Sequence, residues 1–329
     1  MIYKILEKIY NFNFINKLES FNLFSKIYDY KLNKKQITAF IISLKIRGYY
    51  IEEIIGAVNL LSIKSKKKIK PNFKFCDIVG MGGDNINSIN ISTASAFIAS
   101  IYGVKILKHG NYNISSNFGA FNIISKFNIN LNLNFLKIIN FLNNFNIYFL
   151  NASKYNNIFN NVLSIRKKIK NSTIFNIIGP LINPFKPPII LIGSNSINLI
   201  IIIIKILKIL KYKNAAVIYG GGMDEVSIHS NTYISELNKE KIKTYQLIPK
   251  IFGFKKYPLN KILNYNNNKD IFLNILMGKG TNAQNKIISM NVSLLLKLLG
   301  QNNLIKNNKI ILKIIKSGYI LNKIKKIFK

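Results

Sequence analysis

From residue 72 onward, strand-like and helical runs alternate along the chain, and this alternation restricts the possible folds more than any other feature. The strand candidates are residues 73–79, 104–107, 147–150, 189–192 and 215–218. Helical runs lie between them, at about residues 92–101, 116–127, 132–144 and 196–211. Such alternation is typical of α/β proteins with a mostly parallel central sheet. We therefore predict an α/β fold built on a sheet of this kind.

The segments outside the alternation have other patterns. Residues 1–70 show helical periodicity and no strand alternation, which predicts a small all-α domain with a basic linker at its end, residues 62–71. Residues 155–188 carry Gly-Pro and Asn-Pro pairs, and we expect part of this segment to join the helical domain. Residues 227–247 alternate like antiparallel strands, and helical patterns return after them. The second, α/β domain would then span residues 71–329.

The charge of the chain would ordinarily suggest a nucleic-acid partner. The formal net charge is +36 over 329 residues, yet only Arg47 and Arg166 are arginines. The excess is lysine, scattered along the chain and accompanied by abundant Ile and Asn, which are residues encoded largely by A- and T-rich codons. A mutational bias therefore explains the composition, and we expect no nucleic-acid partner. The positive potential still favours anionic substrates.

Cysteine content and hydropathy indicate the compartment. Cys76 is the single cysteine, so it cannot form an internal disulfide, and it lies in a strand-like run that predicts a core position. A reducing compartment, the cytoplasm, is expected. The most apolar stretch, residues 199–210, contains two lysines and is too short to span a bilayer. We expect no membrane association.

A glycine-rich turn follows the first strand candidate. Gly80, Gly82 and Gly83 end the strand, and Ser92 and Thr93 then open an apolar helical run. Glycines let the backbone approach a ligand closely, and amide groups at a helix N-terminus attract anions. The pattern predicts a phosphate site, with an ordinary strand-to-helix turn as the alternative.

Two more polar loops follow strand candidates. One runs from Lys108 to Ser116, and the other is the glycine-rich stretch 219–225, which ends in Asp224 and Glu225. Ligands of open α/β sheets gather at the carboxyl ends of the strands. Lysine and loop amides suit phosphate oxygens, while two carboxylates suit Mg²⁺ held together with substrate phosphates. The loops together predict a site for a magnesium–pyrophosphate substrate.

Taken in order, these motifs resemble those of the anthranilate phosphoribosyltransferases of tryptophan biosynthesis. The matching stretches are residues 80–84, 90–93, 108–111, 115–116, 173–184, 220–227 and 278–280. The resemblance covers most of the chain and implies a fold of the nucleoside phosphorylase/phosphoribosyltransferase type, in a homodimer with the active site between the two domains. It implies transfer of the phosphoribosyl group of 5-phosphoribosyl 1-pyrophosphate to the amine of anthranilate. Components of anthranilate synthase are a further candidate partner.

The resemblance also implies roles for individual residues. Phosphoribosyl pyrophosphate would be bound by Gly80, Gly83, Asp84, Asn90, Ile91, Ser92, Thr93, Lys108, His109, Gly110, Asn111, Tyr112, Asn113, Ile114, Ser115 and Ser116. Ser88 and Ala120 would complete the substrate-binding set. Ser92, Asp224 and Glu225 would bind two Mg²⁺ ions per subunit.

Anthranilate would contact Gly80, Asn111 and Arg166, with the Arg166 guanidinium holding its carboxylate. Lys108, His109, Asn111 and Arg166 would position the substrates and stabilise the transition state. An aromatic amine is barely protonated at neutral pH, so no strong base is required. His109 either orients anthranilate or makes a structural hydrogen bond, and His229 is expected to be structural.

Several positions depart from the family pattern. They are Met81, Asn85, Ser88, Tyr112, Ala120 and Ser172, and a histidine-proline pair is missing around residues 154–155. Tyr112, Ala120 and Ser172 remove polar contacts, which predicts weaker binding or a partial loss of activity. A decayed, non-catalytic relic of the family therefore stays open, as does a pyrimidine nucleoside phosphorylase-like enzyme. The chain length and the Asp224–Glu225 pair favour the transferase.

Overall fold

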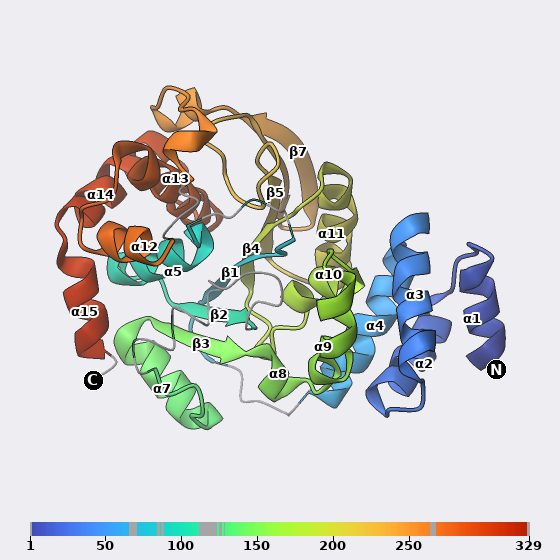
Figure 1. Cartoon of the computed structure of the whole chain (residues 1–329). Coiled ribbons are helices and arrows are strands. Elements are labelled where there is room, and N and C mark those ends of the chain that lie inside the picture. The colour runs from blue at the N-terminus through green and yellow to red at the C-terminus, as the bar shows by residue number, and fades with distance from the viewer. Residues whose placement is uncertain are drawn as a thin grey trace.

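The computed structural model describes residues 2–65, 71–83, 86, 89–111, 124, 127, 129–263 and 268–327. A seven-stranded sheet lies at its centre, in the order β3-β2-β1-β4-β5-β6-β7 (Figure 1). The strands are β1 (Cys76–Gly80), β2 (Ile106–Gly110), β3 (Ile147–Asn151), β4 (Ile189–Gly193), β5 (Asn214–Tyr219), β6 (Thr232–Asn238) and β7 (Lys241–Leu247). Strands β1 to β5 pair in parallel, and β6 and β7 pair antiparallel. The predicted α/β fold with a mostly parallel sheet is confirmed.

Side chains of the central strands are buried on both faces of the sheet. In β4, Ile189 and Leu191 belong to one hydrophobic cluster, whereas Ile190 and Ile192 belong to another. Successive side chains of a strand point to opposite faces, so each face has its own core. Burial on both faces explains why the parallel strands read as nearly continuous apolar runs.

The helix that follows β1 and four helices from the C-terminal part of the chain cover the face of the sheet that carries Ile189 and Leu191. They are α5 (Ile91–Tyr102), α12 (Asn268–Leu276), α13 (Asn282–Leu298), α14 (Leu304–Lys316) and α15 (Tyr319–Ile327). Helix α13 contacts α5 and α14, and most of its side chains are buried. It begins at a capping box in which Thr281 and Gln284 bond each other's backbone. This layer fixes the N-terminus of α5, where the predicted phosphate site begins.

The N-terminal helices lie beyond the opposite face (Figure 1). They are α1 (Ile2–Tyr10), α2 (Lys17–Tyr28), α3 (Lys34–Arg47) and α4 (Ile51–Lys64), and α9 (Ile158–Ile169), α10 (Ile174–Leu181) and α11 (Ile197–Ile209) lie between them and the sheet. One hydrophobic cluster runs through all of these helices to the sheet. Within it, the rings of Phe24 and Phe175 lie 5.9 Å apart. Two further helices, α7 (Phe135–Phe145) and α8 (Ala152–Tyr155), directly precede and follow β3 in the chain.

The structure shifts some predicted boundaries. Strand β1 begins at Cys76 instead of residue 73, because ladder bonding starts where the Cys76 amide donates to the Lys105 carbonyl. Helix α4 continues through Lys64, so the start of the predicted linker was wrong. Strand β6 begins only at Thr232, where pairing with Leu247 of β7 starts, and residues 227–231 form an irregular segment with bends. Most of the helical run predicted at 116–127 lies outside the described residues.

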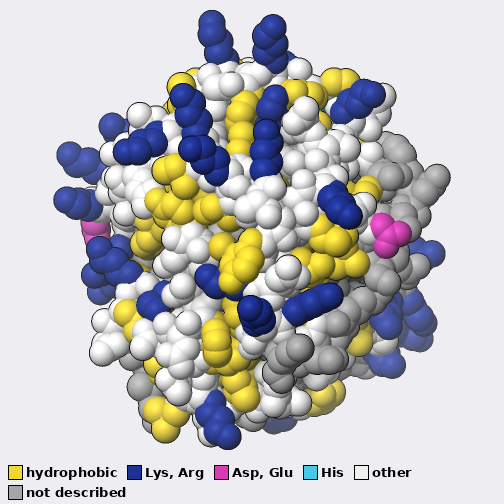
Figure 2. Space-filling view, turned by 90° about the vertical axis from the view of Figure 1, so that its left-hand side faces the viewer, with side chains coloured by type: hydrophobic (Ala, Val, Ile, Leu, Met, Phe, Trp, Pro, Cys, Tyr) yellow, Lys and Arg dark blue, Asp and Glu magenta, His cyan; other side chains and the backbone are white. Residues whose placement is uncertain are grey.

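The surface seen from the side of α14 and α15 carries many lysines. Figure 2 shows them spread over this face and mixed with hydrophobic side chains, instead of gathered into one patch. In the described part of the chain, no helix has both the length and the apolar character needed to cross a membrane.

Candidate active site

A tight glycine turn presents Asp224 and Glu225, which we call the acidic pair. The Gly220 amide donates to the Met223 carbonyl at 2.9 Å, and the turn between them has φ values of 60° at Gly221 and 100° at Gly222. These left-handed conformations favour glycine, which explains the Gly-Gly sequence. The acidic pair follows the turn directly and is buried, with 8% and 5% of the two residues exposed.

Backbone amides of two distant segments hold the acidic pair. The Gly82 amide donates to Asp224 Oδ2 at 2.7 Å, and the Ser92 amide donates to Glu225 Oε1 at 3.0 Å. Space beside Asp224 is limited, because a Cβ atom on Gly80 would lie 2.4 Å from Oδ2. The glycine turn after β1, the N-terminus of α5 and the acidic pair therefore meet at one place, as the sequence predicted for its polar loops.

Lys108 reaches the same place from β2. Its ammonium group is buried and donates to the Ile78 carbonyl and, at 3.2 Å, to Ser92 Oγ. Burial lowers the pKa of Lys108, and the nearby carboxylates of Asp77 and of the acidic pair oppose this shift. A buried cation thus lies beside a hydroxyl and near three carboxylates, an arrangement suited to a metal-bound anion.

The Asp77 side chain joins β1 to β2, the strand that carries Lys108. Both carboxylate oxygens accept the His109 amide at 3.3 Å, and Oδ2 accepts the Asn183 side-chain amide at 2.8 Å. Burial raises the pKa of Asp77 to about 6, even though Lys108 lowers it. The His109 side chain is itself buried, with 2% exposure. Asp77 therefore holds β2 in place next to Lys108, whose side chain extends from this strand to the site.

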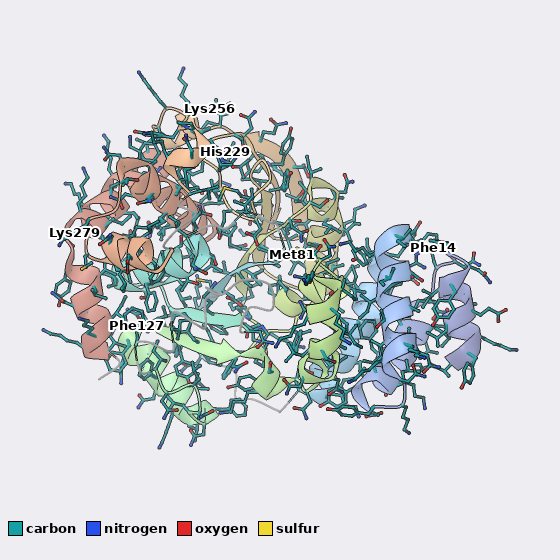
Figure 3. All side chains as sticks on the ribbon, in the orientation of Figure 1. Phe14, Met81, Phe127, His229, Lys256 and Lys279 are labelled. Atoms are coloured by element: carbon teal, nitrogen blue, oxygen red, sulfur yellow. The ribbon has the colours of Figure 1, made fainter. Side chains whose placement is uncertain are left out.

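Arg166 is connected to the glycine turn through one side chain. An Arg166 guanidinium nitrogen donates to Asn176 Oδ1 at 3.1 Å, and Asn176 Nδ2 donates to the Met81 carbonyl at 2.9 Å. Figure 3 places Met81 near the middle of the molecule. Burial lowers the pKa of Arg166 to about 10. The guanidinium is therefore held at a defined position relative to the predicted phosphate turn.

The residues at the start of α5 differ in how they contact the site. Asn90 has a φ of 53° and precedes the helix. Ile91 and Thr93 are fully buried, whereas Ser92 contacts the site twice, since its amide donates to Glu225 and its hydroxyl accepts from Lys108. The Thr93 amide donates to the Asn90 carbonyl at 3.0 Å. Any contact of Ile91 with a ligand would therefore use backbone atoms.

Three further described candidates are Gly83, Gly110 and Asn111. Gly83 is exposed with a φ of 73°, and a Cβ atom there would lie 2.9 Å from the Ser172 side chain. Gly110 ends β2, and the following Asn111 accepts a hydrogen bond from Ser153 Oγ at 2.9 Å. The other candidates lie outside the described residues; they are Asp84, Ser88, Tyr112, Asn113, Ile114, Ser115, Ser116 and Ala120, and so is the departure Asn85.

Sequence reasoning missed the amide side chains that support these loops. Asn176, Asn183 and Asn195 each donate to the glycine turn or the central strands, and Asn195 reaches the Gly82 carbonyl at 2.9 Å. Asn176 and Asn183 lie in the 173–184 stretch that resembles the family. Their roles were hidden because Asn is abundant in this chain and carries little signal on its own.

The donor set fits Mg²⁺. Asp224, Glu225 and Ser92 offer only oxygen atoms, the ligands that this hard cation prefers. Within the described ranges, no group of three or more His, Cys, Asp and Glu side chains could hold a metal by itself. Mg²⁺ commonly binds to one or two carboxylates and completes its shell with water and substrate phosphates. The site therefore suits a cation that arrives with a phosphorylated substrate.

Comparison with known proteins identifies the family. Residues 72–321 match the model described as "Glycosyl transferase family, a/b domain". The anthranilate phosphoribosyltransferase of Serratia proteamaculans is 43% identical over 316 residues, 95% of each chain. That of Buchnera aphidicola from Acyrthosiphon pisum is 44% identical over 326 residues, 98% of this chain and 95% of the relative. The chain belongs to the anthranilate phosphoribosyltransferase family.

Solved structures show the same fold for this anthranilate phosphoribosyltransferase family member. The enzyme from Thermus thermophilus matches with a TM-score of 0.87 and 20% identity over 98% of both chains. The Saccharomyces cerevisiae enzyme, in complex with PRPP and Mg, matches with a TM-score of 0.86 and 24% identity over 99% of this chain and 96% of that one. The family resemblance read from the sequence motifs is confirmed.

Proposed function

We propose that this chain transfers the phosphoribosyl group of 5-phosphoribosyl 1-pyrophosphate to the amine of anthranilate, which gives N-(5-phosphoribosyl)anthranilate and pyrophosphate. The observation that carries the proposal is the meeting of the glycine turn, the α5 N-terminus and the acidic pair through the Gly82–Asp224 and Ser92–Glu225 hydrogen bonds. Membership of the anthranilate phosphoribosyltransferase family favours this activity over that of a pyrimidine nucleoside phosphorylase-like enzyme.

Asp224, Glu225 and the Ser92 hydroxyl would hold Mg²⁺, and we infer two ions per subunit. The yeast relative that binds PRPP and Mg supports the choice of metal. When bound, Mg²⁺ supplies positive charge to the pyrophosphate and so makes it a better leaving group. The buried Lys108 ammonium adds charge at the same place, since it lies 3.2 Å from Ser92 Oγ.

The chain has to position the two reactants more than it has to move protons. The anthranilate nitrogen forms a bond to C1 of the ribose as the bond from C1 to the pyrophosphate oxygen breaks, and the amine proton passes to solvent. Arg166 would hold the anthranilate carboxylate, because a guanidinium matches a carboxylate with two parallel hydrogen bonds. Holding the nucleophile in line and stabilising the leaving group are the main sources of rate enhancement.

The remaining candidates are part of the proposal. Gly80, Gly83, Asn90, Ile91, Thr93, His109, Gly110 and Asn111 would line the substrate site, together with the candidates outside the described residues. We propose two domains, residues 1–70 with part of 155–188 and residues 71–329, in a cytoplasmic homodimer. Components of anthranilate synthase would be its protein partners.

The test mixes purified protein with anthranilate, phosphoribosyl pyrophosphate and Mg²⁺, and follows the fluorescence of anthranilate. We expect a magnesium-dependent loss of fluorescence that disappears in the Asp224→Ala/Glu225→Ala variant. The matched control is Glu7→Gln, a carboxylate removed from the exposed side of α1. An unchanged signal at high enzyme concentration would support the decayed relic. Turnover that survives the double substitution would refute the metal site.

A further inference from the structure

The irregular segment that follows the acidic pair contains a histidine with two hydrogen-bond partners. His229 Nδ1 lies 2.7 Å from Ser227 Oγ, and Nε2 lies 3.1 Å from the Gly221 carbonyl oxygen. Figure 3 labels this side chain. Gly221 belongs to the turn that precedes the acidic pair, so the ring connects the segments on either side of it.

The surrounding donors determine which ring nitrogen carries the proton. Ser227 Oγ accepts the amide hydrogens of His229 and Ser230, each at 3.1 Å. The Ser230 hydroxyl oxygen also lies 3.2 Å from Ser227 Oγ. A hydroxyl has two acceptor positions and one proton. The two amides fill the acceptor positions, and the shortest contact, 2.7 Å to Nδ1, takes the Ser227 proton. The Gly221 carbonyl can only accept, and it therefore requires a proton on Nε2. Both contacts are satisfied by the tautomer with its hydrogen on Nε2.

The turn that His229 contacts packs closely against the segment that carries His229, so it cannot move toward that segment. A Cβ atom on Gly221 would lie 2.0 Å from Ser230 Oγ, which shows how closely the turn packs on the segment that carries His229. The Gly220 amide and the Met223 carbonyl close the turn at 2.9 Å. Asp224 follows without an intervening residue. The direction of the first carboxylate therefore depends on the position of this turn.

A second clamp holds the residue after the acidic pair. The Val226 amide donates to Asn291 Oδ1 at 2.9 Å, and Asn291 Nδ2 donates to the Val226 carbonyl at 3.1 Å. Asn291 is fully buried in α13. The acidic pair thus lies between Val226, which is bonded to the buried helix α13, and the glycine turn, whose Gly221 carbonyl is bonded to His229.

We propose that His229 is a positioning residue for the metal site. Its Nε2–H group holds the Gly221 carbonyl, and the turn in that position presents the acidic pair in the geometry that binds a divalent cation. His229 touches neither substrate nor metal in this role. The inference rests on the proposed function, because it assigns a supporting residue to the same cation site.

Two substitutions test the contacts of the two ring nitrogens separately. The amide of His229→Gln extends about as far as Nε2 and can still donate to Gly221, whereas the shorter amide of His229→Asn reaches only the position of Nδ1 and Ser227. The measurement is Mn²⁺ binding in the presence of pyrophosphate, followed by the electron paramagnetic resonance signal of free Mn²⁺. It requires no turnover. Thermal unfolding checks that each variant is folded, and Asn231→Ala, two residues further along, is the matched control.

We expect His229→Asn to weaken Mn²⁺ binding about fivefold to tenfold, as the loss of one hydrogen bond implies, while His229→Gln and Asn231→Ala stay within about twofold of the wild type. Faster amide hydrogen exchange in residues 219–226 should accompany the weaker binding. Wild-type binding by His229→Asn, or equal losses in the Asn and Gln variants, would overturn the role of Nε2. If the unsubstituted protein bound no Mn²⁺, the cation site itself would be refuted, so the two failures are distinguishable.

Discussion

The backbone amide of Gly82 lies 2.7 Å from a carboxylate oxygen of Asp224, although 142 residues separate the two in the sequence. The hydrogen bond joins the predicted phosphate turn to the predicted metal site. It sets the distance between them before any substrate is present. Preorganised groups of this kind cost no rearrangement during the reaction. The relationship leads to a first prediction about the neighbouring glycines.

Gly80→Ala should abolish most activity while leaving the fold intact. The new Cβ would lie 2.4 Å from Asp224 Oδ2 and push that side chain away from Gly82. A displacement of about 1 Å at a catalytic group lowers the rate about 100-fold. Gly193→Ala is the comparison, because its Cβ would lie 1.5 Å from the Asp224 backbone carbonyl and should damage the fold as well. Steady-state kinetics and thermal unfolding of both variants test this; full activity in Gly80→Ala would contradict it.

Arg166→Lys should raise the KM for anthranilate about 10-fold to 100-fold and leave the KM for phosphoribosyl pyrophosphate nearly unchanged. The lysine keeps the charge but cannot hold a carboxylate with two parallel hydrogen bonds, and hydrogen bonds to charged groups contribute about 1.5–3 kcal/mol. It would also lose the contact with Asn176. Initial rates at varied concentrations of each substrate provide the measurement. Equal effects on both KM values would speak against a role in anthranilate binding.

Glu53→Gln should destabilise the N-terminal helices by about 3 kcal/mol. The side chains of Arg47 and Glu53 are only 4% and 1% exposed and form an ion pair. Glu53 also accepts the amides of Ile15 and Tyr50 at 3.2 Å. Removing one partner of a buried pair leaves the other charge uncompensated. Urea unfolding measures the loss, with Glu7→Gln as the control; a change below about 1 kcal/mol would show that the pair is effectively solvated.

Asp77→Asn should change how stability depends on pH. Burial raises the pKa of Asp77 to about 6 from an ordinary value of 3.8. Between these values the folded protein binds more protons than the unfolded chain, so Asp77 makes the free energy of unfolding fall as the pH rises from about 4 to about 6. The contribution is up to about 3 kcal/mol. Urea unfolding at several pH values should show a smaller fall in Asp77→Asn, and parallel curves for the two proteins would refute the shift.

Much of the fold could be predicted because its signals are local. The five parallel strands were located from their apolar runs, and the antiparallel pair was recognised from its alternation. The glycine turn, Lys108 and the acidic pair were recognised in the same way, because each follows a strand and parallel strands end at one edge of the sheet. Boundaries were less accurate at Cys76 and Lys64, where bonding to a neighbouring segment determines the end of an element.

The sequence by itself determined the secondary structure, the class of sheet and the residue types of the site, since these depend on periodicity and on backbone conformations that glycine permits. The tertiary structure decided which atoms meet. The bond from Gly82 to Asp224, the link from Arg166 through Asn176 to Met81, and the contact of His229 with Gly221 all depend on how the strands are ordered and how loops pack on one another. Such partners lie far apart along the chain or across a turn. No local pattern encodes their distances, because side-chain packing of the whole sheet sets them.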